Sequence, residues 1–172
     1  MVSDTSAVRR SRDEILAILD TVMDPEVPVL SVRELGIVRD VRIDADGAVS
    51  VVVTPTYSGC PAIRVIEQDI EAALHDAGIE PVRIETVYSP AWSSDWIPAE
   101  ARAKLKAYGI APPAPAASSG DLVQLLRVPR TPQCPYCDSR DTEVRSEFGS
   151  TACKSICWCR SCRQPFEEFK GI

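Results

Sequence analysis

Cysteine supplies the candidate chemistry of this chain, because six of its seven cysteines lie between positions 134 and 162. Two Cys-x-x-Cys pairs stand out there, and 21 residues separate one pair from the other. Two intervening residues bring both sulfurs of a pair to the same side of a tight turn, and the longer spacing leaves room for a β-hairpin. The spacing therefore predicts a zinc ribbon with a structural Zn²⁺ held by Cys134, Cys137, Cys159 and Cys162.

Disulfides are the alternative use of clustered cysteines, and the expected compartment decides against them. The first twelve residues carry three arginines and no apolar core, so they do not form a secretory signal. No later stretch is apolar enough to span a bilayer. We therefore expect a cytoplasmic protein in a reducing setting, without a membrane partner, where clustered cysteines act as metal ligands first.

Cys60 stands apart from the other six cysteines, at the end of the polar loop 54–60. A predicted helix over 62–77 begins just after it, with Pro61 at its first turn and Gly78 as its stop. Backbone N–H groups at a helix start stabilise a thiolate, which lowers its pKa and makes it a better nucleophile or metal ligand. The alternative is a small buried residue at a helix cap.

Acidic residues and the single histidine offer weaker candidates. Asp24, Glu26 and Glu34 lie in one predicted loop, but Asp24 also ends a helix and Glu34 suits a solvated loop charge. His75 lies off the apolar face of its helix, which favours a surface position. Because no Gly-rich phosphate loop, Ser-His-Asp set or nucleophile elbow is present, we expect a non-catalytic protein.

Hydrophobic periodicity predicts a small α+β domain with the order α-β-β-α-β-α, followed by the zinc-ribbon mini-domain. Residues 111–120, rich in Pro, Ala and Ser, have the composition of a linker. We therefore divide the chain into an α+β domain over 1–110, a linker over 111–120 and a Cys-rich domain over 121–172. The expected elements of the first domain are helices at 12–23, 62–77 and 98–108 and strands at 38–43, 49–54 and 82–88.

The charge distribution bears on partners. The formal net charge is −6, and the acidity lies before Gly120, since the residues after it are close to neutral. Binding to nucleic acid depends on a basic surface that releases counterions from phosphates. The ribbon alone suggests a zinc-dependent nucleic-acid binder, but this balance argues against a nucleic-acid partner.

Three segments carry a resemblance to a known family: 24–28 (Asp-Pro-Glu-Val-Pro), 34–38 (Glu-Leu-Gly-Ile-Val) and the loop 54–61. With them, residues 12–89 resemble the small α/β domain of SufT-type iron–sulfur maturation proteins. That resemblance implies a reactive thiolate at Cys60, supported by Thr54, Thr56, Ser58 and Gly59 of its loop and by the acidic residues Asp24 and Glu26. It also implies a transient iron–sulfur cluster or iron at this place.

Further segments extend the resemblance to the whole chain: 89–92, 95–97, 108–113, 148–151 and 165–170. Together they resemble the PaaD family, also called PaaJ, which are accessory subunits of the phenylacetyl-CoA epoxidase system of phenylacetate degradation. In that system other subunits carry a di-iron centre and receive electrons from a reductase with a flavin and an iron–sulfur cluster. The resemblance implies a maturation or metal-delivery factor whose partners are the oxygenase and reductase subunits.

The tail departs from the family pattern, which leaves its ligand set open. Asp138 and Arg163 follow the second cysteine of each pair, where glycine is common, and Cys153 or Cys157 is able to replace or supplement a ligand. This surplus motivates the alternative function, a redox or structural subunit with a permanent iron site in the tail. Because an iron–sulfur cluster takes four ligands, a transient site at Cys60 implies sharing with a client or across a homodimer.

Overall fold

The computed structural model describes residues 10–114 and 130–171. The chain divides into two compact units, Met1–Pro55 with Pro61–Pro90 and Thr56–Cys60 with Ala91–Ile172. Within the described ranges, none of the helices combines the length and the apolar character that crossing a membrane requires.

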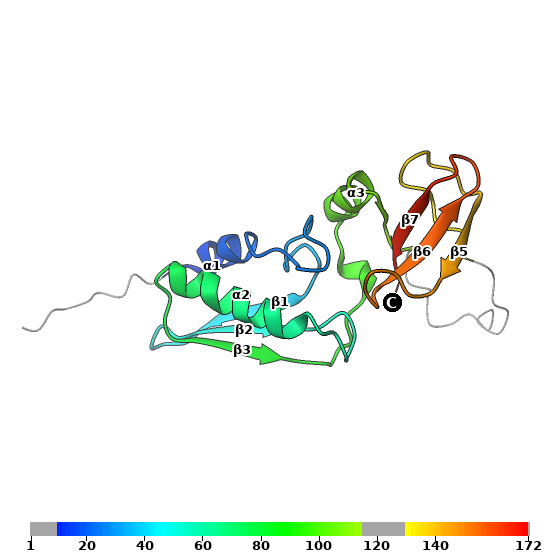
Figure 1. Cartoon of the computed structure of the whole chain (residues 1–172). Helices are drawn as coiled ribbons and strands as arrows, with labels where there is room; N and C mark the ends of the chain where they lie inside the picture. Colours follow the sequence, from blue (N-terminus) through cyan, green and yellow to red (C-terminus); the bar gives the residue numbers. More distant parts are fainter. Residues whose placement is uncertain (1–9, 115–129, 172) are drawn as a thin grey trace, which may run out of the picture. The chain divides into compact units, whose positions relative to one another are not determined.

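The first unit is a three-stranded sheet with two helices on one of its faces (Figure 1). The strands β1 (Val38–Ile43) and β2 (Val49–Val53) form an antiparallel hairpin, and β3 (Val82–Thr86) pairs parallel with β2. The helices are α1 (Arg12–Leu19) and α2 (Ile63–Asp76), and α2 connects β2 to β3. The sheet order is therefore β1-β2-β3, with β1 and β3 at its edges.

The core of the first unit lies between the helices and one face of the sheet. Alternate residues of a strand share a face, so Val49, Val51 and Val53 of β2 point the same way, and all three are buried. The buried residues of α2 recur at helical spacing and are Ile66, Ile70 and Leu74. Gly47, at φ +90°, closes the hairpin between β1 and β2 in a conformation that other residues rarely adopt.

The first helix begins as predicted and ends earlier. Ser11 and Glu14 form a capping box, in which Ser11 Oγ accepts the Glu14 N–H and Glu14 Oε2 accepts the Ser11 N–H at 2.7 Å. The helix ends at Leu19 rather than near residue 23, because the chain turns there and Val22 accepts a backbone hydrogen bond from Val32.

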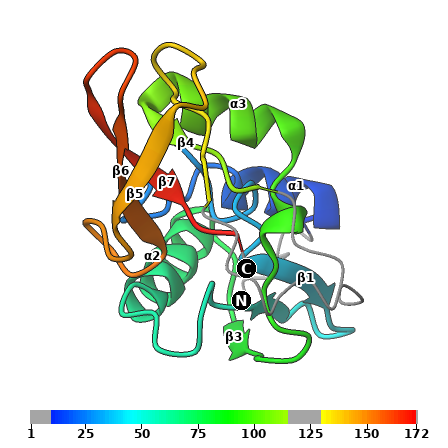
Figure 2. The ribbon, with the colours of Figure 1, turned by 90° about the vertical axis from the view of Figure 1, so that its right-hand side faces the viewer.

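The second unit contains a four-stranded sheet in the order β4-β7-β6-β5. Strands β5 (Thr142–Ser146), β6 (Lys154–Cys159) and β7 (Pro165–Phe169) form an antiparallel meander, visible in Figure 2. The short helix η1 (Ser94–Trp96) and α3 (Ala99–Tyr108) precede β4 (Ile110–Ala111). β4 pairs parallel with β7, opposite Glu167 and Glu168.

Side chains from the segment before β4 and from the ribbon strands meet in the core of this unit. Phe169 is fully buried, and its ring centroid lies 5.9 Å from that of Trp92. Arg102 of α3 donates to the carbonyls of Ser94, Ile97 and Pro113, which ties the helix to the chain on either side of it. A second apolar cluster consists of Ala111, Cys134, Cys157, Cys159 and Phe166.

The α+β class, the element order and the Cys-rich ribbon are confirmed. The compact units, however, divide the chain differently from the predicted domains, because α3 and β4 group with the ribbon. Ala111, expected to start the linker, is instead buried in β4, where its backbone pairs with β7. Residues 115–120 of the predicted linker lie outside the described residues, and the division into domains at 110 and 121 stays a prediction.

Candidate metal centre and the Cys60 loop

Four cysteine sulfurs of the second unit converge at one point. The Sγ atoms of Cys134, Cys137, Cys159 and Cys162 all lie within 4.8 Å of one another. Two of these separations are 3.7 Å, from Cys134 to Cys162, and 3.6 Å, from Cys137 to Cys159. A tetrahedral ion with metal–sulfur bonds of about 2.3 Å holds its sulfurs about 3.8 Å apart. The four side chains therefore fit a single metal ion.

Each cysteine pair lies in a tight turn that aims its sulfurs inward. In the first turn the Asp138 N–H donates to the Cys134 carbonyl at 3.0 Å, and in the second the Cys159 N–H donates to the Gln164 carbonyl at 3.0 Å. Asp138 and Arg163 adopt left-handed conformations, with φ of 60° and 58°. Both follow the second cysteine of a pair, so the turns keep the geometry for which glycine is favoured without having glycine.

The two turns are tied to each other and to α3. Ser139 Oγ and Ser161 Oγ lie 2.7 Å apart, which joins the turns beside the sulfurs. Asp138 forms an ion pair with Lys106 of α3. Sequence spacing gave no signal for these contacts, because each joins segments that are distant in the sequence.

The electrostatics of the sulfurs differ from one another. The Cys162 N–H donates to the Cys159 sulfur and lowers the pKa of Cys159 to about 7. Desolvation by burial raises the pKa of Cys162 to about 12 and also raises the pKa of Cys134. A metal ion must therefore displace protons from Cys134 and Cys162 at neutral pH, whereas Cys159 is partly ionised beforehand.

The two surplus cysteines lie outside this group of sulfurs. Cys157 is buried in the apolar cluster beside the site, and burial raises its pKa to about 11. Cys153 is buried as well, with its sulfur 3.0 Å from Thr151 Oγ1. Among the described residues, the group with metal-binding geometry consists of the four cysteines of the two Cys-x-x-Cys pairs.

The Cys60 loop belongs to the second unit by its contacts. Cys60 is buried, with 9% of its surface exposed, and its N–H donates to the Tyr57 carbonyl at 3.1 Å. Thr56 is buried, Ser58 and Gly59 are exposed, and α2 begins at Ile63, three residues after Cys60.

The predicted supporting residues of the first unit, Asp24, Glu26 and Thr54, are all buried or half-buried. Asp24 is 4% exposed, and its Oδ1 accepts the N–H groups of Glu26 and Val27, both at 2.8 Å. Glu26 is half-buried. Thr54 is buried, and its Oγ1 has no hydrogen-bond partner among the described residues. Asp24 thus stabilises its own loop by accepting hydrogen bonds from one buried and one half-buried backbone N–H.

Comparisons with known proteins agree with the α+β fold of the first unit and with the cysteine-rich ribbon. A family model of iron–sulfur cluster assembly proteins matches residues 12–87, and one of the PaaD zinc beta ribbon domain matches residues 118–170. An Escherichia coli K12 protein, described provisionally as one of the subunits of 1,2-phenylacetyl-CoA epoxidase, is 44% identical over 159 residues, which cover 92% of each chain. The chain belongs to the PaaD family. The resemblance inferred from the sequence is therefore confirmed.

Shorter matches link this PaaD family chain to iron–sulfur maturation. An Fe-S protein maturation auxiliary factor of Porphyromonas gingivalis is 35% identical over 56% of this chain and 91% of its own length. The maturation auxiliary factor YitW of Bacillus subtilis is 33% identical over 49% of this chain and 82% of its own. A crystal structure of a domain of unknown function, DUF59, from Bacillus anthracis superimposes with a TM-score of 0.51 and 27% identity, covering 54% of this chain and 89% of that one.

Proposed function

We propose that this protein is a non-catalytic maturation factor that delivers iron or an iron–sulfur cluster within the phenylacetyl-CoA epoxidase complex of aerobic phenylacetate degradation. The proposal is carried by one observation: four of the seven cysteines form a closed site for a single ion, which leaves Cys60 outside the ribbon on its own loop. The relatives named as Fe-S maturation auxiliary factors support it. The proposed setting is the cytoplasm, where reduced thiols persist.

Zinc is the proposed occupant of the ribbon. Structural zinc sites are closed by four protein ligands and leave no open position for substrate. A cluster with two or more irons separates the sulfurs bound to different irons by an additional metal–metal distance, whereas these four sulfurs all lie within 4.8 Å of one another. The geometry therefore favours one ion over a cluster, and the family model of a zinc beta ribbon supports zinc.

Cys60 is the proposed working thiolate, supported by Thr54, Thr56, Ser58 and Gly59 of its loop. One thiolate supplies one of the four ligands that a cluster takes. The remaining ligands would come from a client or from the second copy in a homodimer. The acidic residues Asp24 and Glu26, in the loop after α1, are also proposed to support this thiolate. The proposed clients are the oxygenase and reductase subunits of the complex.

The test compares two cysteine variants in cells that grow on phenylacetate under iron limitation. Cys60→Ser is expected to lower epoxidase activity severalfold, because serine does not supply a thiolate to iron. Cys153→Ser is the matched control, since Cys153 is also buried and lies outside the ribbon site. Full epoxidase activity in the Cys60→Ser cells would show that the proposed role is wrong.

The second candidate is a redox or structural subunit that holds a permanent iron site in its tail. The surplus of Cys153 and Cys157 favours it, because the six cysteines between positions 134 and 162 exceed the needs of a single zinc. Metal analysis of protein purified without oxygen separates the two functions. Stoichiometric iron and a visible absorption band support the redox subunit, whereas a colourless protein with about one zinc per chain supports the maturation factor.

A further inference from the structure

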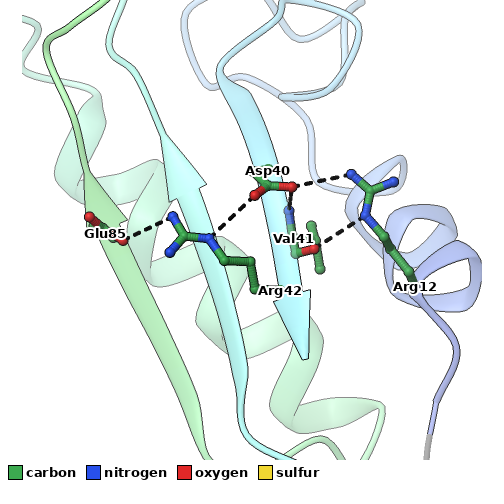
Figure 3. Close-up of polar contacts among 5 residues, drawn as sticks. All are labelled: Arg12, Asp40, Val41, Arg42 and Glu85. Atoms are coloured by element: carbon green, nitrogen blue, oxygen red, sulfur yellow. Dashed lines mark hydrogen bonds and ion pairs between the residues drawn. The ribbon is translucent and has the colours of Figure 1, made fainter. Parts of the chain in front are cut away.

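The two edges of the sheet in the first unit differ in how they meet solvent. At the β1 edge, Arg12 of α1 reaches the outward backbone of Val41, with its Nε donating to the Val41 carbonyl at 3.2 Å (Figure 3). The Val41 N–H donates to Asp40 Oδ1 at 2.9 Å, and Arg12 also pairs with Asp40 at 3.3 Å. A bulge lies between Val38 and Asp40. Side chains and a bulge of this kind block the addition of a further strand.

The β3 edge has no such cover among the described residues. The Val49 N–H donates to the Pro81 carbonyl and the Val87 N–H donates to the Val53 carbonyl, both at 2.9 Å. Because orientation alternates along a strand paired in parallel, residues 81, 83, 85 and 87 direct their backbone groups toward β2. Val82, Ile84 and Thr86 therefore direct one N–H and one carbonyl each away from the sheet.

The side chains of β3 are self-complementary about its centre. Arg83 and Glu85 are exposed and flank Ile84, and both lie on the sheet face that carries Arg42. Glu85 pairs with Arg42 at 3.4 Å, as Figure 3 shows. If β3 meets a second β3 antiparallel and centred on Ile84, Arg83 of each copy faces Glu85 of the other. An isologous contact requires this kind of self-complementarity.

We propose that the β3 edge is a homodimer interface, at which the β3 strands of two copies pair antiparallel and join their sheets. In this register Ile84 faces its counterpart in a hydrogen-bonded pair, and Val82 faces Thr86 of the partner subunit. Every outward backbone group of the three residues then has a partner. Arg83 and Glu85 occupy the non-hydrogen-bonded positions, where side chains of opposite strands approach most closely.

This interface would form the homodimer that the proposed function names, and to that extent it rests on the proposed function. Its test uses the isolated protein without iron or client. Loss of the dimer would leave the Cys60 experiment unaffected, so the two ideas fail separately. A single pair of strand edges is small beside the roughly 1,600 Å² of a stable interface. We therefore expect a weak dimer with a dissociation constant on the order of 10 µM.

The first test is sedimentation equilibrium of the full chain with a thiol reductant, so that no disulfide links the copies. Arg83→Glu and Glu85→Arg are each expected to raise the dissociation constant at least about tenfold, because each reversal sets like charges opposite at two symmetric positions. The double variant Arg83→Glu/Glu85→Arg restores opposite charges and is expected to return within about threefold of the original value. Arg64→Glu, an exposed reversal on α2, is the control for net charge.

The second test uses no substitution. Amide hydrogen exchange of the original chain, compared at low and high protein concentration, should show added protection for Val82, Ile84 and Thr86 at high concentration. The amides of Arg83 and Glu85 bond to β2 in either state and are the internal control. A monomer at every concentration, a dimer that resists both single reversals, a double variant that stays monomeric, or protection without this alternation would each overturn the proposal.

Discussion

Substitutions of Asp24 test whether its carboxylate serves the stability of its loop or the proposed site. The structural role is measurable, because the carboxylate accepts hydrogen bonds from the backbone of that loop. Asp24 is 4% exposed, and one oxygen accepts two backbone N–H groups at 2.8 Å. Asp24→Ala removes this acceptor and leaves the buried Val27 N–H and the half-buried Glu26 N–H without that partner. At about 1–2 kcal/mol for the buried donor and about half of that for the half-buried one, the free energy of unfolding of the first unit should fall by about 1.5–3 kcal/mol.

Asp24→Asn keeps an oxygen in the same place and should cost about 1 kcal/mol or less. Asp46→Ala is the matched control, since Asp46 is exposed and accepts one hydrogen bond, from the Ala48 N–H at 3.1 Å. Its loss should cost about 0.5 kcal/mol. Native-state hydrogen exchange of the Val51 amide reports the opening of the first unit in all three variants.

Two results would refute this reasoning. One is an Asp24→Ala protein that loses less than about 1 kcal/mol, and the other is an Asn variant as unstable as the Ala variant. Epoxidase activity adds the functional answer. If Asp24→Asn is stable and fully active, the carboxylate charge serves the loop alone, and if it is stable but inactive, the charge serves the proposed site.

Three further predictions concern the second unit. Metal binding should strengthen as pH rises, because each thiol must lose its proton before it binds the metal. Calorimetry in buffers of different ionisation enthalpy counts the protons released on binding. It should find about one proton fewer released at pH 8 than at pH 6, since the pKa of Cys159 is about 7. Cys153→Ser and Cys157→Ala should each retain about one zinc per chain by elemental analysis, because neither sulfur joins the four-sulfur group, and a loss of zinc would assign that residue to the site. Phe169→Ala should destabilise the unit by about 3–5 kcal/mol in denaturant titrations, whereas Phe148→Ala, at a side chain with 70% exposure, should cost less than about 1 kcal/mol, and equal losses would contradict the packing described.

The metal centre is the feature that the sequence predicts most directly. The x₂ spacing within each pair fixes a local turn, and local geometry then aims the sulfurs. The sequence left Cys153 and Cys157 open as ligands, because neither residue type nor strand alternation tells which cysteines lie near enough to the other sulfurs. Cys157 and Cys159 share a face of that strand, yet the 4.8 Å group includes Cys159 and not Cys157.

The grouping of α3 and β4 with the ribbon lay beyond sequence reasoning. β4 is two residues long, and its pairing with β7 uses backbone groups that every residue except proline carries. The Pro- and Ala-rich composition after Ile110 therefore suggested a linker at Ala111. The closure of the β1 edge was also invisible, because Arg12 and Val41 meet only after α1 packs beside the sheet.

Asp24 shows a middle case. Its place before Pro25 predicts the end of a helix, whereas α1 ends earlier, at Leu19, with Asp20 as its cap. The Asp24 side chain then accepts hydrogen bonds from the residues that follow it, a common use of aspartate in turns. A resemblance to maturation proteins assigned the same residue to a functional loop, and sequence alone does not choose between these roles.

The central claim is that Cys60 delivers iron to the oxygenase, and the iron content of the oxygenase subunit measures it most directly. The subunit would be purified from iron-limited cells that carry the original protein, Cys60→Ser or Cys153→Ser, and its iron would be counted per chain. The account predicts an iron-depleted oxygenase in the Cys60→Ser cells alone, with unchanged zinc in the variant protein. An oxygenase with equal iron in all three would contradict it.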